Sequence, residues 1–345
     1  MPLRLSSPHV TRNNSTAGVM QKVLLAMVPG IAALTLLFGW GTLIQILLCV
    51  GFGLVFEAAA VRLRKQNLSF YLSDYSAIVT AVLLAVAIPP TAPYWIAIVG
   101  MLVAIIFGKQ VYGGLGNNPF NPAMVAYALL LVSFPVQMTS WVLPGETLAS
   151  FTETLSLIFG SATSTGLGVD GLTGATPLDL LRNRGSVTTS EVWSGTALSS
   201  IAAAYQYVAL AWLVGGLALL YLKVFTWHTP ISMILSLLVI SALFYGYDPD
   251  NYLDPLSHLT LGATMLGAFF IATDPVSSAT STRGKVVFGA GIGLMVFAIR
   301  TWGNYPDAIA FAVLLMNLSA PLIDQYTQPR AYGHKGIRKG PRGEE

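Results

Sequence analysis

Cysteine is almost absent from this chain of 345 residues, which contains only Cys49. A single cysteine can form no disulfide within the chain, and it cannot supply the set of thiolates that holds an iron–sulfur cluster. Histidine is scarce too, and His9, His228, His258 and His334 are too far apart to match the ligand spacing of a zinc or haem site. We therefore expect no metal centre, and any redox cofactor should be organic.

Charge is also scarce, at 10% of residues, whereas 54% are hydrophobic and the mean hydropathy is +0.67. Soluble domains carry about 25% charged residues, so this composition excludes an ordinary soluble protein. Apolar segments recur along most of the chain and predict an all-α polytopic membrane protein with about ten transmembrane helices. The predicted segments are 23–38, 43–61, 76–88, 95–107, 123–134, 205–221, 231–245, 259–272, 286–299 and 308–323.

The segments divide into two groups of five, separated by one long polar insertion. The sequences at 122–131 and 306–315 match at several positions in register, and each opens the last helix of its group. Because five is odd, two such repeats would be inverted, an architecture found in many transporters. We predict an amino-terminal segment 1–22, a first repeat 23–135, a loop 136–204, a second repeat 205–323 and a basic tail 324–345.

Lys and Arg residues indicate the orientation. If both termini are cytoplasmic, all but three of the 18 Lys and Arg residues fall on the cytoplasmic side, as the positive-inside rule requires. The exceptions are Arg182, Arg184 and Arg300. The chain is thus expected in a bacterial inner membrane with the 136–204 loop periplasmic. The basic tail is interpreted as a solvated terminus, and no nucleic-acid partner is expected.

The long loop contains two patterns of interest. Gly166–Gly171 matches G-x-G-x-x-G, but no strand or βαβ unit is expected around it, so we interpret the match as accidental. The segment 170–177, Asp-Gly-Leu-Thr-Gly-Ala-Thr-Pro, presents threonine hydroxyls on a polar loop. Pro177 restricts the residue before it to an extended conformation, which should present the Thr176 hydroxyl. Residues 149–159 are expected to form a short amphipathic helix.

The Thr173–Thr176 sequence resembles the attachment motif of the RnfD/NqrB family, whose members belong to the Rnf ion-translocating ferredoxin:NAD oxidoreductase complex and to the sodium-pumping NADH:quinone oxidoreductase. Four further stretches resemble the family, so the likeness covers nearly the whole chain. They are 112–123, 134–141, 262–270 and 273–276.

The resemblance implies that FMN is attached through a phosphodiester to Thr176, by a flavin transferase that uses FAD. The other motif residues would be Asp170, Gly171, Thr173, Gly174 and Ala175. It also allows a noncovalent riboflavin. The expected partners are the other Rnf subunits, including the second FMN-bearing one, and membrane lipid. In such a complex the chain would relay electrons between ferredoxin and NAD sites on other subunits, coupled to Na⁺ or H⁺ transport, and would not be catalytic alone.

Acidic residues within apolar segments are costly and are therefore functional candidates. We consider Glu57 and Asp274, which lies at a helix end, as candidates for an ion path. The structural alternatives are pairing of Glu57 to Arg62, and helix capping or interfacial solvation for Asp274. The segment 117–122, Asn-Asn-Pro-Phe-Asn-Pro, predicts a helix that begins at Pro122. That helix start suits either a bound flavin, quinone or anionic group, or an ordinary capped loop.

Two other classes of function remain open. A stand-alone solute channel or secondary transporter would also have ten helices in inverted repeats, and would move substrate without partners. A purely structural membrane scaffold would bind no flavin and conduct nothing. Only the redox subunit accounts for the motif at Thr176.

Overall fold

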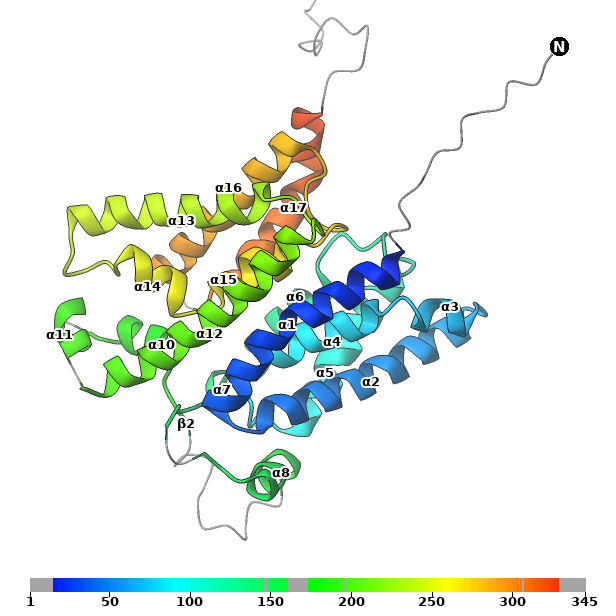
Figure 1. The fold of residues 1–345 in the computed structure, drawn as a ribbon, viewed down its shortest axis with the longest axis horizontal. Helices are drawn as coiled ribbons and strands as arrows, with labels where there is room; N and C mark the ends of the chain where they lie inside the picture. Colours follow the sequence, from blue (N-terminus) through cyan, green and yellow to red (C-terminus); the bar gives the residue numbers. More distant parts are fainter. Residues whose placement is uncertain are drawn as a thin grey trace, which may run out of the picture.

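The computed structural model of the chain describes residues 15–145, 148–160, 173–185, 187–194, 196–303, 305 and 307–328. Asp170 and Gly171 of the predicted attachment motif lie outside the described residues, and so does Pro306 of the internal duplication. Figure 1 shows an assembly of helices, with one short pairing of two strands among the described residues.

The helices of the amino-terminal half follow the predicted apolar segments. They are α1 (Thr16–Phe38), α2 (Gly41–Leu63), α3 (Leu68–Leu72), α4 (Ser76–Ala87), α5 (Tyr94–Leu102) with its π-helical continuation η1 (Val103–Phe107), the 3₁₀ turn η2 (Gln110–Tyr112), α6 (Pro122–Ser133) and α7 (Pro135–Thr139).

The predicted polar loop holds β1 (Trp141–Val142), α8 (Phe151–Phe159), β2 (Thr173–Gly174), α10 (Pro177–Arg182) and α11 (Thr189–Ser194). The short helix expected at 149–159 is confirmed as α8. The carboxyl-terminal half contains α12 (Thr196–Tyr221), α13 (His228–Tyr247), α14 (Pro255–Thr260), α15 (Thr264–Leu266), the π-helical η4 (Gly267–Ile271), α16 (Thr282–Trp302) and α17 (Ile309–Thr327).

Seven helical segments within the described residues are long and apolar enough to cross a membrane. They are 16–38, 41–63, 94–112, 201–221, 228–247, 282–302 and 309–327. The other three predicted segments are shorter or interrupted: α4 and α6 have 12 residues each, and the region 255–271 is divided into α14, α15 and η4. A helix of 12 residues spans only about 18 Å of a hydrocarbon core of about 30 Å. The chain is thus a multi-pass, all-helical membrane protein.

Local sequence explains why α4 is short. Tyr75 has a left-handed backbone (φ 62°), and the Asp74 carboxylate accepts hydrogen bonds from the Ser76 N–H (2.7 Å) and hydroxyl (2.6 Å), so the helix starts sharply at Ser76. The sequence Pro89-Pro90 follows directly after the helix and ends it.

The two halves of the chain meet along α1 and α12, which lie antiparallel and side by side in Figure 1. Their approach depends on glycine. A Cβ at Gly30 would lie 2.4 Å from the Trp212 ring, and one at Gly215 would overlap the Ala26 carbonyl. Small residues allow such close backbone packing in membranes, where the hydrophobic effect does not drive helices together.

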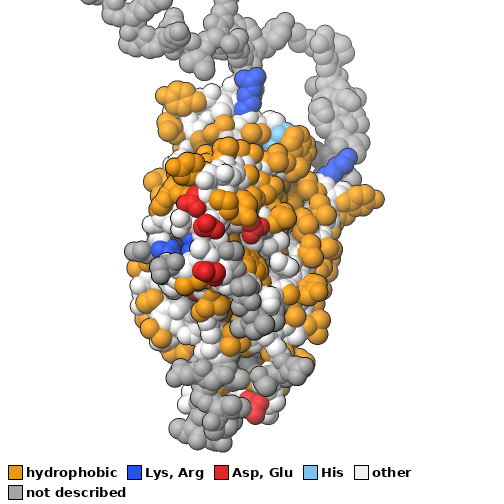
Figure 2. Space-filling view, turned by 90° about the vertical axis from the view of Figure 1, so that its left-hand side faces the viewer, with side chains coloured by type: hydrophobic (Ala, Val, Ile, Leu, Met, Phe, Trp, Pro, Cys, Tyr) orange, Lys and Arg blue, Asp and Glu red, His pale blue; other side chains and the backbone are white. Residues whose placement is uncertain are grey.

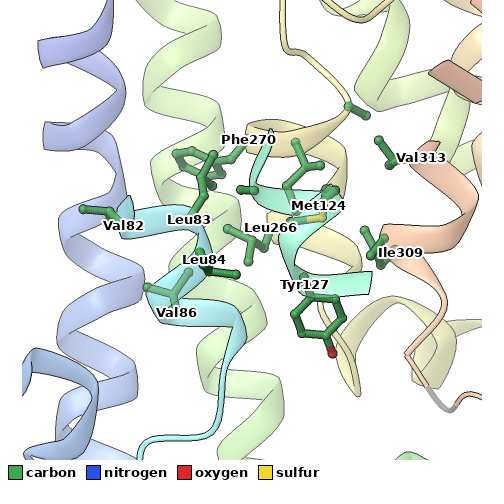
Figure 3. Close-up of a cluster of buried hydrophobic side chains, with 14 of the residues drawn as sticks. Val82, Leu83, Leu84, Val86, Met124, Tyr127, Leu266, Phe270, Ile309 and Val313 are labelled. Atoms are coloured by element: carbon green, nitrogen blue, oxygen red, sulfur yellow. The ribbon is translucent and has the colours of Figure 1, made fainter. Parts of the chain in front are cut away.

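The core lies where helices from both halves converge. Figure 3 shows Leu83 and Leu84 of α4 and Met124 of α6 facing Leu266, with Ile309 of α17 beside them. All five side chains are buried. Figure 2 shows hydrophobic side chains over much of the outer surface, with several Asp and Glu side chains gathered in the middle of that face. Exposed apolar side chains of this number suit a surface in contact with lipid.

Candidate functional site

Thr176 lies at the amino-terminal cap of α10. Its backbone is extended (φ −68°, ψ 159°), and Pro177 occupies the first helical position. This confirms the conformation expected from the Thr-Pro sequence, because a residue before proline avoids the helical region. The Thr176 side chain is half-buried.

The Thr176 hydroxyl is held by Asp179, one turn further along the chain. It donates a hydrogen bond of 2.6 Å to Asp179 Oδ2 and accepts one of 3.2 Å from the Asp179 N–H. The Thr176 N–H donates to the same carboxylate oxygen at 3.2 Å. Thr176 and Asp179 thus form a reciprocal capping box that fixes the side-chain orientation of Thr176.

The residues before Thr176 are positioned by strand pairing. Thr173 pairs with Val142 and Gly174 with Trp141 in an antiparallel register. Gly174 packs closely against the Leu143 side chain, since a Cβ there would lie 2.8 Å from the Leu143 Cδ2 atom. The pairing holds the motif beside β1, which follows α7. Only Ala175 lies between β2 and Thr176, the capping residue of α10.

Thr176 borders a cavity of about 120 Å³, which we call the Thr176 cavity. Residues from both halves of the chain line it, and the lining is mainly apolar with several aromatic rings. The rings come from Phe38, Tyr127, Trp141, Tyr205 and Trp212. Phe38 packs edge-on against Tyr205, with ring centroids 5.3 Å apart. An apolar, aromatic lining with few polar groups is typical of a site for a flat organic ligand, but about 120 Å³ is less than the roughly 300–1,000 Å³ of most ligand pockets, so only part of such a ligand could enter.

A buried cation lies directly behind the wall of this cavity. Arg300 of α16 donates hydrogen bonds to the His258 carbonyl (2.6 Å) and to the Thr264 hydroxyl (3.0 Å). Its guanidinium lies 3.7 Å from Asp307, which lines the Thr176 cavity. Gly262, also in the lining, leaves room for the guanidinium, since a Cβ there would be 2.5 Å from Arg300 Nη2. Arg300 thus places a positive charge near the cavity, and the Asp307 carboxylate partly offsets that charge.

A second cavity, of about 350 Å³, lies toward the opposite ends of α1 and α12; we call it the Asp274 cavity. Its polar lining comes from several elements of both halves. The polar residues include Ser76, Lys109, Asn118, Asn121, Thr229 and Asp274. Asp274 accepts hydrogen bonds from the Ser277 hydroxyl (2.8 Å) and the Val276 N–H (3.2 Å). Burial raises the pKa of the Asp274 carboxyl above its usual value, and these two hydrogen bonds partly oppose that rise.

Glu57 connects to this cavity through Lys109. The Lys109 ammonium lies 2.8 Å from Glu57 Oε1 and donates to the Ser76 hydroxyl at 2.7 Å. Gln110 Nε2 donates to the same Glu57 oxygen at 2.8 Å. The structural alternative considered for Glu57, an ion pair with Arg62 in the same helix, is therefore wrong. The two candidates for an ion path, Glu57 and Asp274, are linked by a cavity that Lys109 and Asp274 both line.

The helix start predicted at Pro122 is confirmed, since α6 begins there and borders the Asp274 cavity. The Asn121 side chain accepts hydrogen bonds from the N–H groups of Ala123 (3.1 Å) and Met124 (3.3 Å). These two N–H groups are thus capped within the chain. Before this helix the backbone turns through Gly113, Gly114 and Gly116, all with φ near +100°.

Sequence reasoning did not identify Asp179, Lys109 or Arg300 as site residues. The sequence Thr-Pro-Leu-Asp at 176–179 has the spacing of a capping box and could have identified Asp179. Lys109 had been interpreted as a basic residue at a cytoplasmic boundary, but it is almost fully buried. No local pattern identifies Lys109 or Arg300, because the hydrogen-bond partners of both side chains are distant in the sequence.

Comparison with known proteins identifies the family of the chain. A family model described as the NQR2, RnfD, RnfE family matches residues 4–333. The chain is similar to the D subunit of an ion-translocating oxidoreductase complex from Ectopseudomonas mendocina, with 52% identity over 340 residues, covering 98% of this chain and 97% of the relative. Relatives with the same description from Vibrio cholerae serotype O1 and Escherichia coli O127:H6 are 49% and 48% identical, and each is covered to 98%. The chain belongs to the NQR2, RnfD, RnfE family.

Proposed function

We propose that this protein is the RnfD component of an Rnf-type ion-translocating oxidoreductase complex, and that it carries FMN covalently on Thr176. The observation that carries the proposal is the position of the Thr176 hydroxyl, which is half-buried at the edge of an aromatic-lined cavity and lies within the attachment motif. The family membership and the relatives named as D subunits of such complexes support it. Asp170, Gly171, Thr173, Gly174 and Ala175 would complete the motif that a flavin transferase recognises.

The residue types around Thr176 suit a flavin that is attached at the edge of the cavity and enters it in part. The hydroxyl provides the oxygen for the phosphodiester, and the aromatic side chains Tyr127, Tyr205 and Trp212 provide flat apolar surfaces against which a ring system could pack. FMN, when attached, supplies the redox chemistry, which here would be a relay of electrons between ferredoxin and NAD sites on other subunits. The chain itself positions the cofactor, excludes water with its apolar lining and sets the local charge through Arg300 and Asp307.

The decisive experiment is to co-produce the full chain with a flavin transferase and to measure in-gel flavin fluorescence after denaturation. We expect a fluorescent band, FMN mass on the peptide that contains Thr176, and loss of both in Thr176→Ala. Thr139→Ala is the matched control, because Thr139 lines the same cavity but lies outside the motif. A dark, unmodified wild-type band beside an active transferase would overturn the proposal and favour a stand-alone channel or secondary transporter.

The Asp274 cavity is the site that we propose for a noncovalent riboflavin. It has several polar side chains that suit a ligand with both ring amides and hydroxyl groups, including those of Asn118, Thr229 and Asp274. Asn118 Oδ1 is buried and has no hydrogen-bond partner among the described residues. Mild extraction of the purified chain should release riboflavin, and Asn118→Ala should reduce the amount released. Extracts without riboflavin would contradict this assignment.

The same cavity supports the hypothesis that Glu57 and Asp274 contribute to an ion path coupled to electron transfer. Lys109, which pairs with Glu57, lines the cavity together with Asp274 and Lys285, and these ionisable groups come from distant parts of the chain. Glu57→Gln and Asp274→Asn should reduce Na⁺ or H⁺ transport by the assembled complex more than they reduce electron transfer. Unchanged ion transport in both variants would eliminate these residues from the path.

We also infer two inverted five-helix repeats, at 23–135 and 205–323, joined by the loop 136–204. The packing supports this, because equivalent helices make equivalent contacts: α2 packs on α5 as α13 packs on α16, and α1 packs on α4 as α12 packs on α15. Two helices of the first repeat also pack on their own counterparts, α1 on α12 and α6 on α17. We place the chain in a bacterial inner membrane with its termini, 1–22 and 324–345, in the cytoplasm and Thr176 on the periplasmic side. There it would meet the second FMN-bearing protein of the complex.

A further inference from the structure

Reciprocal capping boxes begin three helices of the described part of the loop that carries Thr176: Ser150 with Glu153 at α8, Thr176 with Asp179 at α10, and Thr188 with Glu191 at α11. The boxes at α8 and α10 differ in one respect. At α8, the Glu153 carboxylate accepts the Ser150 N–H at 2.7 Å, and the Ser150 hydroxyl lies 3.3 Å from the Thr152 hydroxyl. At α10, the Asp179 carboxylate accepts the Thr176 hydroxyl itself at 2.6 Å, while its bond from the backbone N–H is longer, at 3.2 Å. An O–H···O⁻ contact of 2.6 Å is a strong, charge-assisted hydrogen bond.

Geometry places the Asp179 carboxylate where a general base would have to be. A base must lie within hydrogen-bond reach of the proton that it removes, about 2.6–3.2 Å between heavy atoms. A threonine hydroxyl is a weak nucleophile until a neighbouring base takes its proton. Both hydrogen-bond partners of the Thr176 hydroxyl within the described residues belong to Asp179.

We propose that Asp179 is a catalytic residue of the modification reaction, accepting the proton of the Thr176 hydroxyl when flavin is attached. This inference rests on the proposed flavin attachment and adds to it: the chain supplies part of the chemistry for its own modification.

Attachment is a phosphoryl transfer in which atoms and charge balance. Thr176 Oγ1 attacks the phosphorus of FAD that is linked to the riboflavin, and a new Oγ1–P bond forms. The bond from that phosphorus to the bridging oxygen breaks, and AMP leaves with that oxygen and its electron pair. The hydroxyl proton passes to Asp179 Oδ2 and then to solvent. No atom is oxidised or reduced.

The hydrogen bond from the Thr176 hydroxyl to Asp179 can exist only before flavin is attached. Once Oγ1 is esterified it has no hydrogen to donate, and the phosphodiester brings a negative charge beside the Asp179 carboxylate. Like charges at this separation repel, so the carboxylate must turn away from Oγ1. Other ionisable groups bordering the same cavity are Tyr127, Tyr205 and Asp307, and none of them hydrogen-bonds to Thr176 within the described part of the chain.

The experiment measures the initial rate of flavin attachment. Full-length chain made without a transferase is purified in detergent, mixed with purified transferase and FAD, quenched at intervals and measured by in-gel fluorescence. Asp179→Asn keeps a side-chain oxygen that can accept the cap hydrogen bonds but removes the base. We expect a rate about 10²-fold slower, the lower end of what a positioned general base contributes. Glu153→Gln makes the same change in the capping box of α8 and should leave the rate unchanged.

Each outcome has a distinct meaning. Wild-type and Asp179→Asn chains labelled at equal rates would overturn the role of Asp179. A wild-type chain that stays unlabelled, while an established acceptor protein is labelled in the same mixture, would overturn the proposed function instead. If Asp179→Asn does not fold, Asp179→Glu and Asp179→Gln are compared, since they differ only in basicity. Faster labelling of the Glu variant supports the proposal, and equal labelling refutes it.

Discussion

Glu57 and Lys109 form a buried ion pair between residues 52 positions apart in the sequence, with 2.8 Å between Lys109 Nζ and Glu57 Oε1. Their side chains are 0% and 1% exposed. Lys109 follows the π-helical end of the α5 helix, and Glu57 lies in α2, so the pair joins two helices of the first half. Gln110 completes the contact by donating to the same oxygen.

Removal of one partner of this pair should destabilise the protein strongly. Lys109→Met would leave the Glu57 carboxylate buried without its cation, which costs about 3–5 kcal/mol for a buried pair. The double variant Glu57→Gln, Lys109→Met should recover most of that loss, because no uncompensated charge remains. Thermal unfolding of the purified chain in detergent measures both. A double variant as unstable as Lys109→Met would show that packing, not charge, makes the pair important.

Glu57 also shows what the sequence could and could not reveal. The apolar segments were evident from composition, because a helix in lipid must satisfy its own backbone and present apolar side chains. The partner of Glu57 was not evident, because helical periodicity compares only residues within a turn or two, which suggested Arg62. Lys109 becomes a neighbour only when α2 and α5 pack together.

At Thr176, too, one part of the site could be predicted from the sequence and another part could not. The motif located the residue, and the Thr-Pro sequence correctly predicted its extended backbone. The cavity beside it could not be predicted, because its aromatic lining comes from α1, α6, β1 and α12, which are far apart in the chain. Local rules therefore identified the attachment residue, whereas its surroundings depend on tertiary packing.

Gly174 lies against the Leu143 side chain. In Gly174→Ala the new Cβ would lie 2.8 Å from Leu143 Cδ2, so the Leu143 side chain or the pairing of β1 with β2 must shift. Because Leu143 is 41% exposed and can turn toward solvent, we expect a cost of about 1 kcal/mol, the low end of overpacking, and a slower flavin attachment at Thr176. Leu143→Ala in the same chain should restore the rate. Gly145→Ala is the control, since a Cβ there meets nothing within 4 Å. Normal attachment in Gly174→Ala would contradict this view of the motif.

Gly262 should be less tolerant of a side chain. In Gly262→Ala the Cβ would lie 2.5 Å from Arg300 Nη2 and 2.9 Å from Leu178 Cδ1. The guanidinium has little freedom to move, because it is held by the His258 carbonyl and the Thr264 hydroxyl. We expect a loss of about 1–3 kcal/mol in the free energy of unfolding. Gly246→Ala, where a Cβ meets nothing within 4 Å, should show no such loss.

The near absence of cysteine allows the orientation to be tested directly. Cys49 is fully buried, so the wild-type chain should react little with a membrane-impermeant maleimide. Single cysteines can then be placed at two exposed positions, Ala175 beside the attachment residue and Gln66 in the turn after α2. In spheroplasts, Ala175→Cys should be labelled from outside, and Gln66→Cys should be labelled only after the membrane is disrupted.

The labelling pattern follows from the positive-inside rule, because Arg62 lies in the last turn of α2 and Arg64 and Lys65 follow the helix. The two cysteines lie on opposite sides of the membrane only if an odd number of crossings separates them. Labelling of Gln66→Cys in intact spheroplasts, with Ala175→Cys protected, would invert the assignment and place Thr176 in the cytoplasm. Labelling of both from outside would require an even number of crossings between positions 66 and 175, and would therefore contradict the proposed five-helix repeat.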